Sequence, residues 1–309
     1  MSFKISVIIV NWNTKNLLIN CVRSIRESSI CDQIEIIVVD NASHDGSIEA
    51  IRSLFSNLII IQNQVNEGFS KANNRGIKIS TGEYICLINS DVTVEKDTIK
   101  NMKEFLEHTP SIGILGPKML YPDGRFQISY RKLPSIWGIL CNSIGLNIFF
   151  PKSRLFNPLF DYRGIENSIT SVEALVGAFW MINKTVIDQT GYLDENFFFY
   201  AEDIDYCKRV TLSNFLIIYF PKAQIYHHHG ASSSSKPDAY YIEQQRANLF
   251  YWRKHYGVLL RQCVLVILIF NEFFRIFKAL GLLLLPSRGA FAFGKLKKHL
   301  RCLFWLIFI

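Results

Sequence analysis

The chain has 309 residues, of which 49% are hydrophobic and 19% are charged, and its formal net charge is +8. This composition predicts one large domain with an appendage, or two domains, and excludes a disordered chain. Most of the excess charge lies in residues 258–309, where Glu272 is the only acid. A nearly neutral body with a basic, apolar tail argues against a nucleic-acid-binding protein. Seven scattered cysteines without a CxxC pair predict buried thiols in a reducing compartment.

The first 110 residues alternate between short β-branched runs and helical patterns. The runs at 5–10, 35–40, 58–63 and 84–89 predict strands that are buried on both faces. The first run is too short for a signal-peptide core, and we interpret it as a strand rather than a targeting segment. Helices are expected at 17–25, 48–55, 69–80 and 97–108. The alternation predicts a doubly wound α/β sheet.

Polar residues follow each predicted strand, at the sheet edge where ligands of such folds bind. They are Asn11-Trp12-Asn13, Asp40-Asn41, Asn66-Glu67-Gly68 and Asn89-Ser90-Asp91. Four such ends on one edge indicate a site for a polar ligand that carries phosphate and sugar. The chain has neither GxGxxG nor GxxxxGK[ST], so a dinucleotide fingerprint and a P-loop are not supported.

The second half of the chain has a different pattern. Residues 116–127 predict a hairpin around Pro122-Asp123-Gly124, and residues 172–182 predict a strand that Gly177 interrupts. A late strand is expected at 216–221 and a helix at 239–256. The four serines before Pro237 predict a flexible linker or lid. Residues 133–170 show no assignable pattern.

Several motifs occur together in one order: ISVIIVNWN, IIVVDNASHDGS, NEGFSKANNRGI, TGEYICLINSDV, GPKMLYPDGR, VGAFWMI, GYLDENFFFYAEDIDYCKR and IYHHHGASS. In this order the chain resembles the inverting glycosyltransferases of family 2, and among them the bacterial rhamnosyltransferase-like branch. The resemblance covers roughly residues 4–256. It implies a GT-A type, Rossmann-like mixed α/β sheet flanked by helices over residues 1–257. Within this domain, residues 1–115 would bind the nucleotide and residues 116–257 the acceptor.

The resemblance implies a donor site at the strand ends. Asp40 would bind the nucleobase or ribose, with Val10, Asn11 and Trp12 beside it, and Trp12 could stack on the base. The remaining donor-binding candidates are Asn41, Asn66, Gly68, Asn73, Asn89 and Ser90. A helix cap or Asx turn remains the alternative for Asp40, and core packing remains the alternative for Trp12.

A divalent metal, Mg²⁺ or Mn²⁺, is the expected cofactor. Asn89-Ser90-Asp91 stands where the family has a metal-binding Asp-x-Asp, and such hard ions prefer oxygen ligands. Because the first acid is replaced by Asn89, Asp91 is the expected carboxylate ligand, and the strictness of the metal dependence stays open. His227, His228 and His229 cannot all meet one ion on a strand, because successive side chains alternate between faces. The resemblance selects His227.

The proton of the acceptor hydroxyl requires a base. The resemblance assigns this role to Asp203, and we expect Glu202 and Gly177 on the acceptor side. The four aromatic residues 197–200 would form apolar walls that raise the pKa of the base and exclude water. The alternative is that the acids of this stretch only stabilise a helix N-terminus. Asp205 and Arg209 are spaced as a helical ion pair.

The tail contains three apolar runs, 262–271, 279–287 and 302–309, each shorter than a membrane-spanning helix. A stripe of Leu296, Leu300, Leu303, Phe304 and Ile307 is flanked by basic residues. Residues 258–309 are therefore predicted to be a basic amphipathic tail on an anionic membrane surface, at the cytoplasmic face of the cell membrane. Two alternatives stay open: packing on the body or on a second subunit as a homo-oligomer, and a spanning hairpin.

The resulting functional hypothesis is an inverting glycosyltransferase in cell-surface glycan synthesis. It would move a sugar from a nucleotide diphosphate donor to a lipid-linked or polysaccharide acceptor, with L-rhamnose from dTDP-L-rhamnose as the specific candidate. One alternative is a sugar nucleotidyltransferase, although NWNTKN lacks the Gly-rich basic loop that such an enzyme needs after its first strand. The other is a catalytically degenerate, membrane-bound protein that binds nucleotide sugars.

Overall fold

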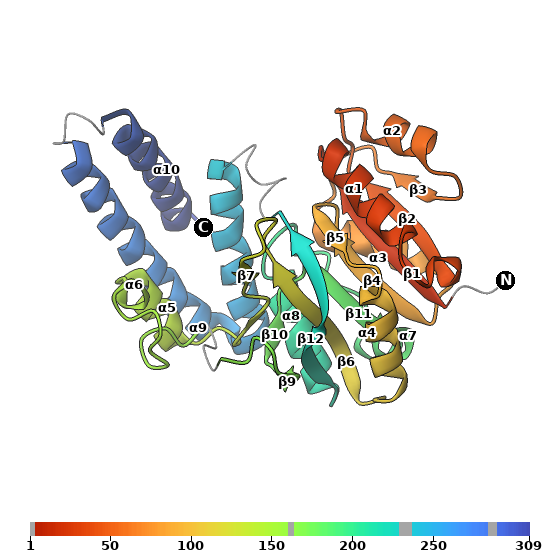
Figure 1. Ribbon diagram of the computed structural model, residues 1–309. Coiled ribbons are helices and arrows are strands. Elements are labelled where there is room, and N and C mark those ends of the chain that lie inside the picture. Colours follow the sequence, from red (N-terminus) through yellow and green to blue (C-terminus); the bar gives the residue numbers. More distant parts are fainter. Residues whose placement is uncertain (1–3, 160–163, 229–236, 284–288) are drawn as a thin grey trace. The chain divides into compact units, whose positions relative to one another are not determined.

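The structure, a computed structural model, describes residues 4–159, 164–228, 237–283 and 289–309 (Figure 1). The chain forms two compact units. Unit 1 consists of residues 1–133 and 163–235, and unit 2 consists of residues 134–162 and 236–309. These units are defined by how the chain packs, whereas the predicted boundary between residues 257 and 258 was based on charge. The predicted domains therefore stay a prediction.

Unit 1 alternates strands and helices in the way that its sequence predicts. Its strands are β1 (Ile5–Asn11), β2 (Ile34–Asp40), β3 (Ile59–Gln62), β4 (Tyr84–Asn89), β5 (Val92–Val94), β6 (Ile112–Leu120), β7 (Phe126–Gln127), β8 (Tyr130–Arg131), β9 (Thr170–Ser171), β10 (Ala174–Leu175), β11 (Phe179–Asn183) and β12 (Leu216–His227). Its helices are α1 (Lys15–Arg26), α2 (Ser47–Leu54), α3 (Phe69–Ile79), α4 (Thr98–Glu107), α7 (Lys184–Thr190) and α8 (Glu202–Leu212), with a 3-10 turn, η1 (Cys31–Gln33).

The main sheet has the strand order β3-β2-β1-β4-β11-β6-β12-β5. The strands β3, β2, β1 and β4 are parallel, and β11 is inserted antiparallel between β4 and β6. Asn11 pairs with Asp40, and the preceding residue, Val10, pairs with Asn89. The polar residues that end these three strands therefore lie in one row, and the predicted mixed α/β sheet flanked by helices is confirmed.

Helices cover both faces of this sheet (Figure 1). On one face, Val7 of β1 is buried in a common core with Val22 of α1 and Met102 of α4. On the other face, Gly76 of α3 lies so close to Ile8 of β1 that a Cβ at this glycine would clash with the isoleucine side chain. Burial from both sides explains why the central strands are continuous β-branched runs rather than alternating ones.

The second half of unit 1 contains elements that the sequence did and did not predict. The hairpin is present, with β7 antiparallel to β6 and Tyr121 N donating to Arg125 O at 2.8 Å. Gly177 interrupts the predicted strand, which appears as β10 and β11. The late strand is longer than predicted, because β12 continues to His227, which pairs with Val92 of β5. The short strands β5, β8 and β9 had no separate signal.

Unit 2 is helical: α5 (Ile136–Ser143), α6 (Leu146–Phe149), α9 (Pro237–Leu283) and α10 (Gly289–Ile307). The helix α9 is two helices joined at Gly257, whose φ of 83° and ψ of −179° suit a residue without a Cβ. The predicted helix at 239–256 is the first of them. Both α5 and α10 pack against α9. Between α9 and α10, the buried Glu272 accepts from Tyr241 Oη at 2.5 Å and lies 2.8 Å from His299 Nδ1.

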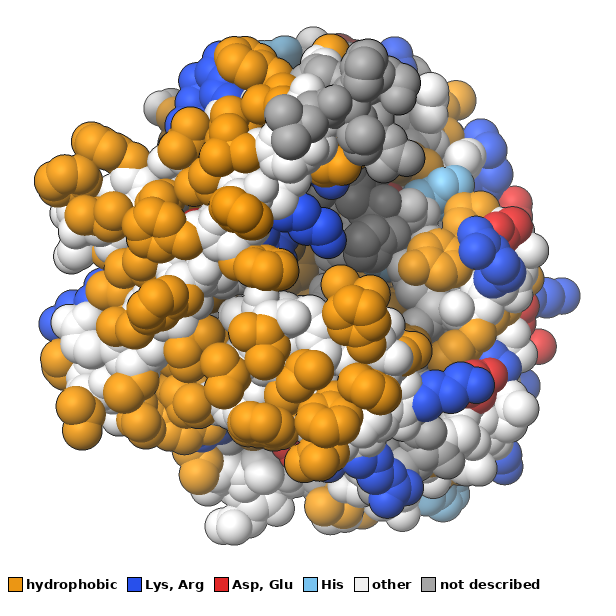
Figure 2. Space-filling model, turned by 90° about the vertical axis from the view of Figure 1, so that its left-hand side faces the viewer, with side chains coloured by type: hydrophobic (Ala, Val, Ile, Leu, Met, Phe, Trp, Pro, Cys, Tyr) orange, Lys and Arg blue, Asp and Glu red, His pale blue; other side chains and the backbone are white. Residues whose placement is uncertain are grey.

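The two long helices of unit 2 expose many large apolar side chains, and Figure 2 shows hydrophobic side chains gathered over the face that it draws. They are Leu259, Val266, Phe270, Phe273, Phe274 and Phe277 on α9 and Phe291, Phe293, Leu300, Phe304 and Ile307 on α10. In contrast to the predicted single stripe, Leu303 is buried and Leu296 is half-buried. Among the described residues, no helix combines the length and the hydropathy that a bilayer crossing requires.

Candidate active site

The polar residues after β1 and β2 form a hydrogen-bonded network at the carboxyl edge of the sheet. Asp40 is buried, and its carboxylate accepts from Asn11 Nδ2 at 2.8 Å and from the backbone nitrogen and Oγ of Ser43 at 2.9 and 2.6 Å. Thr14 Oγ1 donates to Asn11 Oδ1 and lies 2.7 Å from Ser90 Oγ, after β4. The local turn at Asp40 is the alternative that the sequence left open, and its contact with a nucleobase stays a prediction.

Other donor-site candidates differ in how accessible they are. Val10, Trp12 and Asn89 are half-buried at the same edge, so each presents part of its side chain outside the core. Asn73 is fully buried on α3, where its Nδ2 donates to Phe69 O at 3.0 Å. A direct contact between Asn73 and a ligand would therefore need the surrounding residues to move.

The loop before α3 is tied to both halves of unit 1. Asn41 Nδ2 donates to Gly68 O at 3.1 Å, Asn63 Nδ2 donates to Asn41 Oδ1 at 2.8 Å, and Gly68 N donates to Asn66 Oδ1 at 3.0 Å. Gly68 has a φ of 85°, and a Cβ at this residue would lie 2.4 Å from Phe198 O. The strand-end residues thus hold the loop that contacts the predicted acceptor-side stretch.

Asp91 and His227 come together, although 136 positions separate them by number. Asp91 Oδ1 lies 3.4 Å from His227 Nε2, and His227 Nδ1 lies 3.0 Å from Gln127 Oε1; both members of the pair are buried. Burial alone would raise the pKa of Asp91, but the hydrogen bond and charge of His227 outweigh burial and lower it below its ordinary value. His228 is exposed, as strand alternation predicts, and His229 lies outside the described residues.

The helix α8 begins with the two predicted acids. It is preceded by Tyr200 and Ala201, with φ values of 71° and 62°, and two consecutive left-handed non-glycine residues are a strained way to begin a helix. Glu202 and Asp203 are both buried, and Glu202 Oε2 has no hydrogen-bond partner among the described residues. Burial, with the neighbouring charge of Asp203, raises the pKa of Glu202 to about 8.

Asp203 is held by a cation that the sequence did not predict there. Arg131 Nη2 lies 2.5 Å from Asp203 Oδ2, while Ile204 N donates to Oδ1 at 2.8 Å. A Cβ at Gly177 would lie 3.3 Å from Asp203 Cβ and 4.0 Å from Phe69 Cε1. Gly177, Asp203 and Phe69 are therefore neighbours, and the guanidinium of Arg131 also contacts the predicted base; the predicted apolar walls stay a prediction.

The two sides of the candidate site meet where β4 and β11 pair. Asn89 N donates to Ala178 O at 3.0 Å. Asp91 follows Asn89 by two residues, and Gly177, which contacts Asp203, immediately precedes Ala178. The strand that precedes Asp91 and the strand that follows Gly177, the neighbour of Asp203, are therefore hydrogen-bonded to each other in one sheet.

The aromatic stretch before α8 is partly buried: Phe198 is exposed, and Phe199 and Tyr200 are half-buried. Phe197 is buried, and the Phe199 ring lies 6.4 Å from that of Phe69, edge to face. Further along α8, the fully buried Asp205 accepts from Arg209 Nε at 2.9 Å. This confirms the predicted helical pair, and it shows that the third acid of the stretch has a structural partner.

A divalent cation fits the Asp91–His227 pair. Without a cation, the proton on His227 Nε2 faces the Asp91 carboxylate. A cation would displace this proton, and with the remaining proton on Nδ1 directed at Gln127 Oε1, Nε2 and the carboxylate would form a nitrogen and oxygen donor set that suits Mn²⁺. Within the described ranges, no cluster of three or more His, Cys, Asp or Glu side chains is arranged to hold a metal. The remaining ligands would then be oxygens of a bound diphosphate or water.

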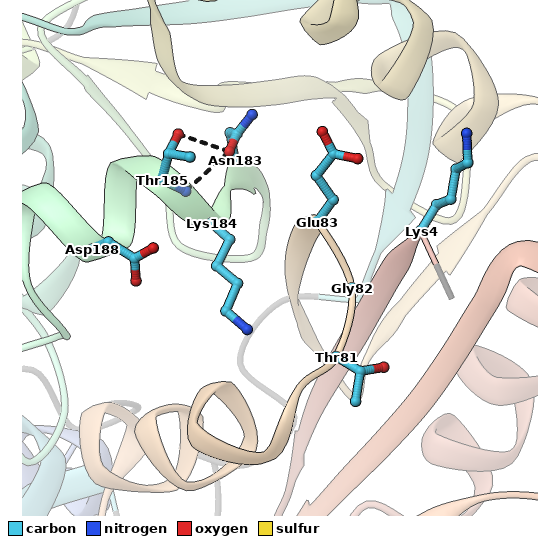
Figure 3. Close-up of a pocket in the computed structure, with 8 residues that line it drawn as sticks. All are labelled: Lys4, Thr81, Gly82, Glu83, Asn183, Lys184, Thr185 and Asp188. Carbon is cyan, nitrogen blue, oxygen red and sulfur yellow. Dashed lines mark hydrogen bonds between the residues drawn. The ribbon is translucent and has the colours of Figure 1, made fainter. Parts of the chain in front are cut away.

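A pocket of about 430 Å³ opens at the other edge of the sheet (Figure 3). It is lined by Lys4, Thr81, Gly82, Glu83, Asn183, Lys184, Thr185 and Asp188. Lys4 and Glu83 stand just before β1 and β4, at the amino ends of these parallel strands. The pocket therefore contains none of the predicted site residues.

Comparison with known proteins identifies the family. A family model described as glycosyl transferase family 2 matches residues 6–191, more than half of the chain. The chain belongs to glycosyl transferase family 2. The predicted family and the predicted enzyme class, a glycosyltransferase, are confirmed.

Two relatives of this family 2 glycosyltransferase have named activities. The low-salt glycan biosynthesis hexosyltransferase Agl10 of Haloferax volcanii is 30% identical over 216 residues, which cover 68% of this chain and 62% of that relative. The N-acetylglucosaminyl-diphospho-decaprenol L-rhamnosyltransferase of Mycobacterium tuberculosis is 25% identical over 236 residues, 72% of this chain and 76% of that relative. The match thus spans less than two thirds of the first relative's length.

Solved structures of low sequence identity share the fold. The mannosyltransferase PcManGT from Pyrobaculum calidifontis, in complex with GDP-Man and Mn²⁺, has a TM-score of 0.58 at 14% identity and covers 98% of this chain and 87% of its own. S. aureus TarS has a TM-score of 0.53 at 16% identity, with 97% and 81% covered. These similarities concern the fold alone.

Two residues of the site, Gln127 and Arg131, were not predicted. Both lie in or just after the predicted hairpin, but their partners are 100 and 72 residues away. The available signal was a lone arginine and a glutamine in a β-prone stretch, which sequence reasoning cannot connect to His227 or Asp203.

Proposed function

We propose that this protein is an inverting glycosyltransferase that transfers a sugar from a nucleotide diphosphate donor to a hydroxyl of a cell-surface glycan precursor. The observation that carries the proposal is the joint placement of Asp91 with His227 on one side and Asp203 with Gly177 on the other, at the carboxyl edge of a family 2 sheet. The first pair suits a diphosphate with its cation, and the second suits an incoming hydroxyl.

In the proposed reaction, the acceptor oxygen attacks the anomeric carbon as the bond from that carbon to the diphosphate breaks, and a single displacement inverts the centre. Asp203 accepts the proton of the attacking hydroxyl. Glu202, protonated at neutral pH because its pKa is raised to about 8, offers a hydrogen bond to the acceptor through its unpartnered oxygen. Gly177 leaves room for the acceptor beside Asp203.

On the donor side, a row of strand-end residues would bind the nucleoside. This row consists of Val10, Asn11, Trp12, Asp40 and Asn41. The further donor contacts proposed are Asn66, Gly68, Asn89 and Ser90, and Asn73 would join them only after the residues that bury it move. Asp91 and His227 would hold a divalent cation, which as a Lewis acid would neutralise charge on the leaving diphosphate. Asn89 brings an amide and no charge, so Asp91 is the carboxylate that this arrangement depends on.

For the donor we propose dTDP-L-rhamnose, and for the acceptor a lipid-linked glycan. The support is the rhamnosyltransferase relative, whose name specifies a diphospho-decaprenol acceptor. The test is transfer by the purified full chain from a panel of nucleotide sugars to a prenyl-diphosphate sugar acceptor. Transfer that is specific for another donor would replace rhamnose and keep the reaction class, whereas release of pyrophosphate from a nucleoside triphosphate would replace the reaction class.

We further propose that the exposed apolar side chains of α9 and α10 bind an anionic membrane surface at the cytoplasmic face. Lys295, Lys297 and Arg301 are exposed beside this apolar surface and would contact acidic headgroups. Binding of the full chain to vesicles with and without anionic lipid tests the proposal. Phe270→Glu with Phe277→Glu should abolish binding, while Leu212→Glu, an equally exposed apolar site of unit 1, should not. Equal vesicle binding by the parent, the Phe270/Phe277 double variant and the Leu212→Glu variant would contradict the proposal.

A further inference from the structure

The segment from Phe126 to Arg131 contacts both sides of the candidate active site. Gln127 Oε1 lies 3.0 Å from His227 Nδ1. Four residues later, Arg131 Nη2 lies 2.5 Å from Asp203 Oδ2. The predicted metal ligand and the predicted base therefore each have a side-chain partner on one short piece of chain.

This segment is itself firmly held. Gln127 lies on β7, which pairs with β6. Val176 N donates to Ser129 O at 2.8 Å, and the buried Tyr130 ring lies 4.9 Å from the ring of Tyr219 on β12. A segment held by strand pairing and buried side chains can set the geometry of the groups that it contacts, because functional groups need positions accurate to a fraction of an ångström.

The contact of Arg131 fixes the orientation of the Asp203 carboxylate. One oxygen accepts from the guanidinium and the other accepts from Ile204 N at 2.8 Å, so rotation of the carboxylate breaks both contacts. Each carboxylate oxygen has a second lone pair, which remains available for the proton of an acceptor. Arg131 Nε is buried without a hydrogen-bond partner among the described residues. This nitrogen therefore does not help to hold the guanidinium in place.

Gln127 has the corresponding effect on His227. An Oε1 atom can only accept, so its contact with Nδ1 favours a proton on Nδ1, and the proton that a cation would displace is then the one on Nε2, beside Asp91. Gln127 is buried, so water does not compete for this contact. Neither residue needs to touch a substrate to affect the reaction.

We propose that the segment Phe126–Arg131 is a shared positioning element, in which Arg131 orients the proton-accepting Asp203 and Gln127 orients the metal-binding His227. The proposal rests on the proposed function. It predicts that each residue acts through its partner: Arg131 on the rate of transfer, and Gln127 on the affinity for the cation.

The test of Arg131 compares Arg131→Gln with Arg125→Gln. Arg125 is a matched control, because it also pairs with an aspartate, Asp123 at 2.7 Å, but is exposed on the same hairpin. Arg131→Gln should lower kcat by about 10- to 100-fold, as misplacement of a reacting group does, with dTDP affinity in calorimetry unchanged. Arg125→Gln should leave both unchanged. Equal kcat in the two variants would overturn the role of Arg131, as would a parallel loss of dTDP affinity.

Two additional variants separate positioning from folding. Arg131→Lys keeps the charge and should recover part of the lost rate, with a melting temperature close to that of the parent. In an Asp203→Asn background, Arg131→Gln should cause no further loss of the residual rate, because residues that act as a unit are not additive. A full additional loss in that background would show that Arg131 acts independently of Asp203.

The test of Gln127 uses Mn²⁺ as the probe, with binding followed by electron paramagnetic resonance. Gln127→Leu should weaken Mn²⁺ binding about tenfold, and Gln127→Glu, which keeps an acceptor oxygen, should restore it. Unchanged Mn²⁺ affinity in Gln127→Leu would overturn this part of the proposal. If Asp203→Asn turned over normally, the proposed function itself would fail; if only Arg131→Gln did, the positioning role alone would fail.

Discussion

Substitution of Gly68 tests how firmly the donor-side loop is joined to the stretch that precedes α8. Phe69 N donates to Phe198 O at 2.7 Å, and a Cβ at Gly68 would lie 2.4 Å from that oxygen and 2.8 Å from Phe198 Cδ2. No side chain fits unless the backbone of residues 197–200 moves away. Because α8 begins immediately after this stretch, the displacement should reach Asp203.

The magnitude follows from two separate costs. Gly68 has a φ of 85° and a ψ of 177°, and a non-glycine residue in such a region costs about 1–3 kcal/mol. Overpacking typically adds about 1–3 kcal/mol. We therefore expect Gly68→Ala to lower the free energy of unfolding by about 2–6 kcal/mol.

Gly124 provides the matched control. Its φ is 83°, but a Cβ at this position would meet no atom within 4 Å. Gly124→Ala should therefore show the backbone cost alone, about 1–2 kcal/mol. Urea unfolding of both variants, followed by circular dichroism, measures the difference. Equal destabilisation would refute the argument that Gly68 is required by its contact with Phe198.

Three further predictions concern the site. Gly177→Ala should lower kcat about tenfold with little loss of stability, since the new Cβ, 3.3 Å from Asp203 Cβ, must shift the base by a few tenths of an ångström; steady-state kinetics would contradict this if kcat were unchanged. The pKa of Glu202 is raised from 4.5 to about 8, so the folded protein retains a proton that the unfolded chain releases, and stability should fall as pH rises from about 4.5 through 8. In Glu202→Gln this decline in the urea midpoint between pH 5 and 9 should be smaller, and an unchanged slope would assign it to other groups. Asp91→Asn should weaken Mn²⁺-dependent dTDP binding by about 10- to 100-fold, because the cation site loses its carboxylate and keeps only the imidazole of His227. Calorimetry that gives the parental affinity would remove Asp91 from the cation site.

The parallel half of the fold could be predicted because its physical signals are local. Strands such as β1 and β2 are buried on both faces, so their sequences are continuous β-branched runs that stop at polar residues. The Gly124 turn is likewise encoded within a few residues. The βα alternation then fixes which strand ends share an edge.

The remainder depended on contacts that no local pattern encodes. The short strand β8 has two residues, and it exists because it pairs with β10. The extension of β12 to His227 depends on its pairing with β5. In the tail, both faces of α10 are apolar, so a single predicted stripe could not separate the buried Leu303 from the exposed Phe304.

The candidate site shows the same division. The sequence supplied Asp91, Asp203 and His227 through the family resemblance, and the fold places the first and last 3.4 Å apart. It could not supply Arg131, because an ion pair with Asp203 across 72 residues leaves no trace in spacing. The aromatic residues before α8 gave no signal of a guanidinium beside the base.

The most direct test of the account is a paired measurement on Asp203→Asn: the rate of sugar transfer to a prenyl-diphosphate acceptor, and the affinity for dTDP with Mn²⁺ by calorimetry. If Asp203 is the base of a site whose diphosphate is bound by other residues, transfer should fall by about 10²- to 10⁴-fold while the dissociation constant stays within twofold of the parent. Transfer at the parental rate, or loss of nucleotide affinity as large as the loss of rate, would contradict it.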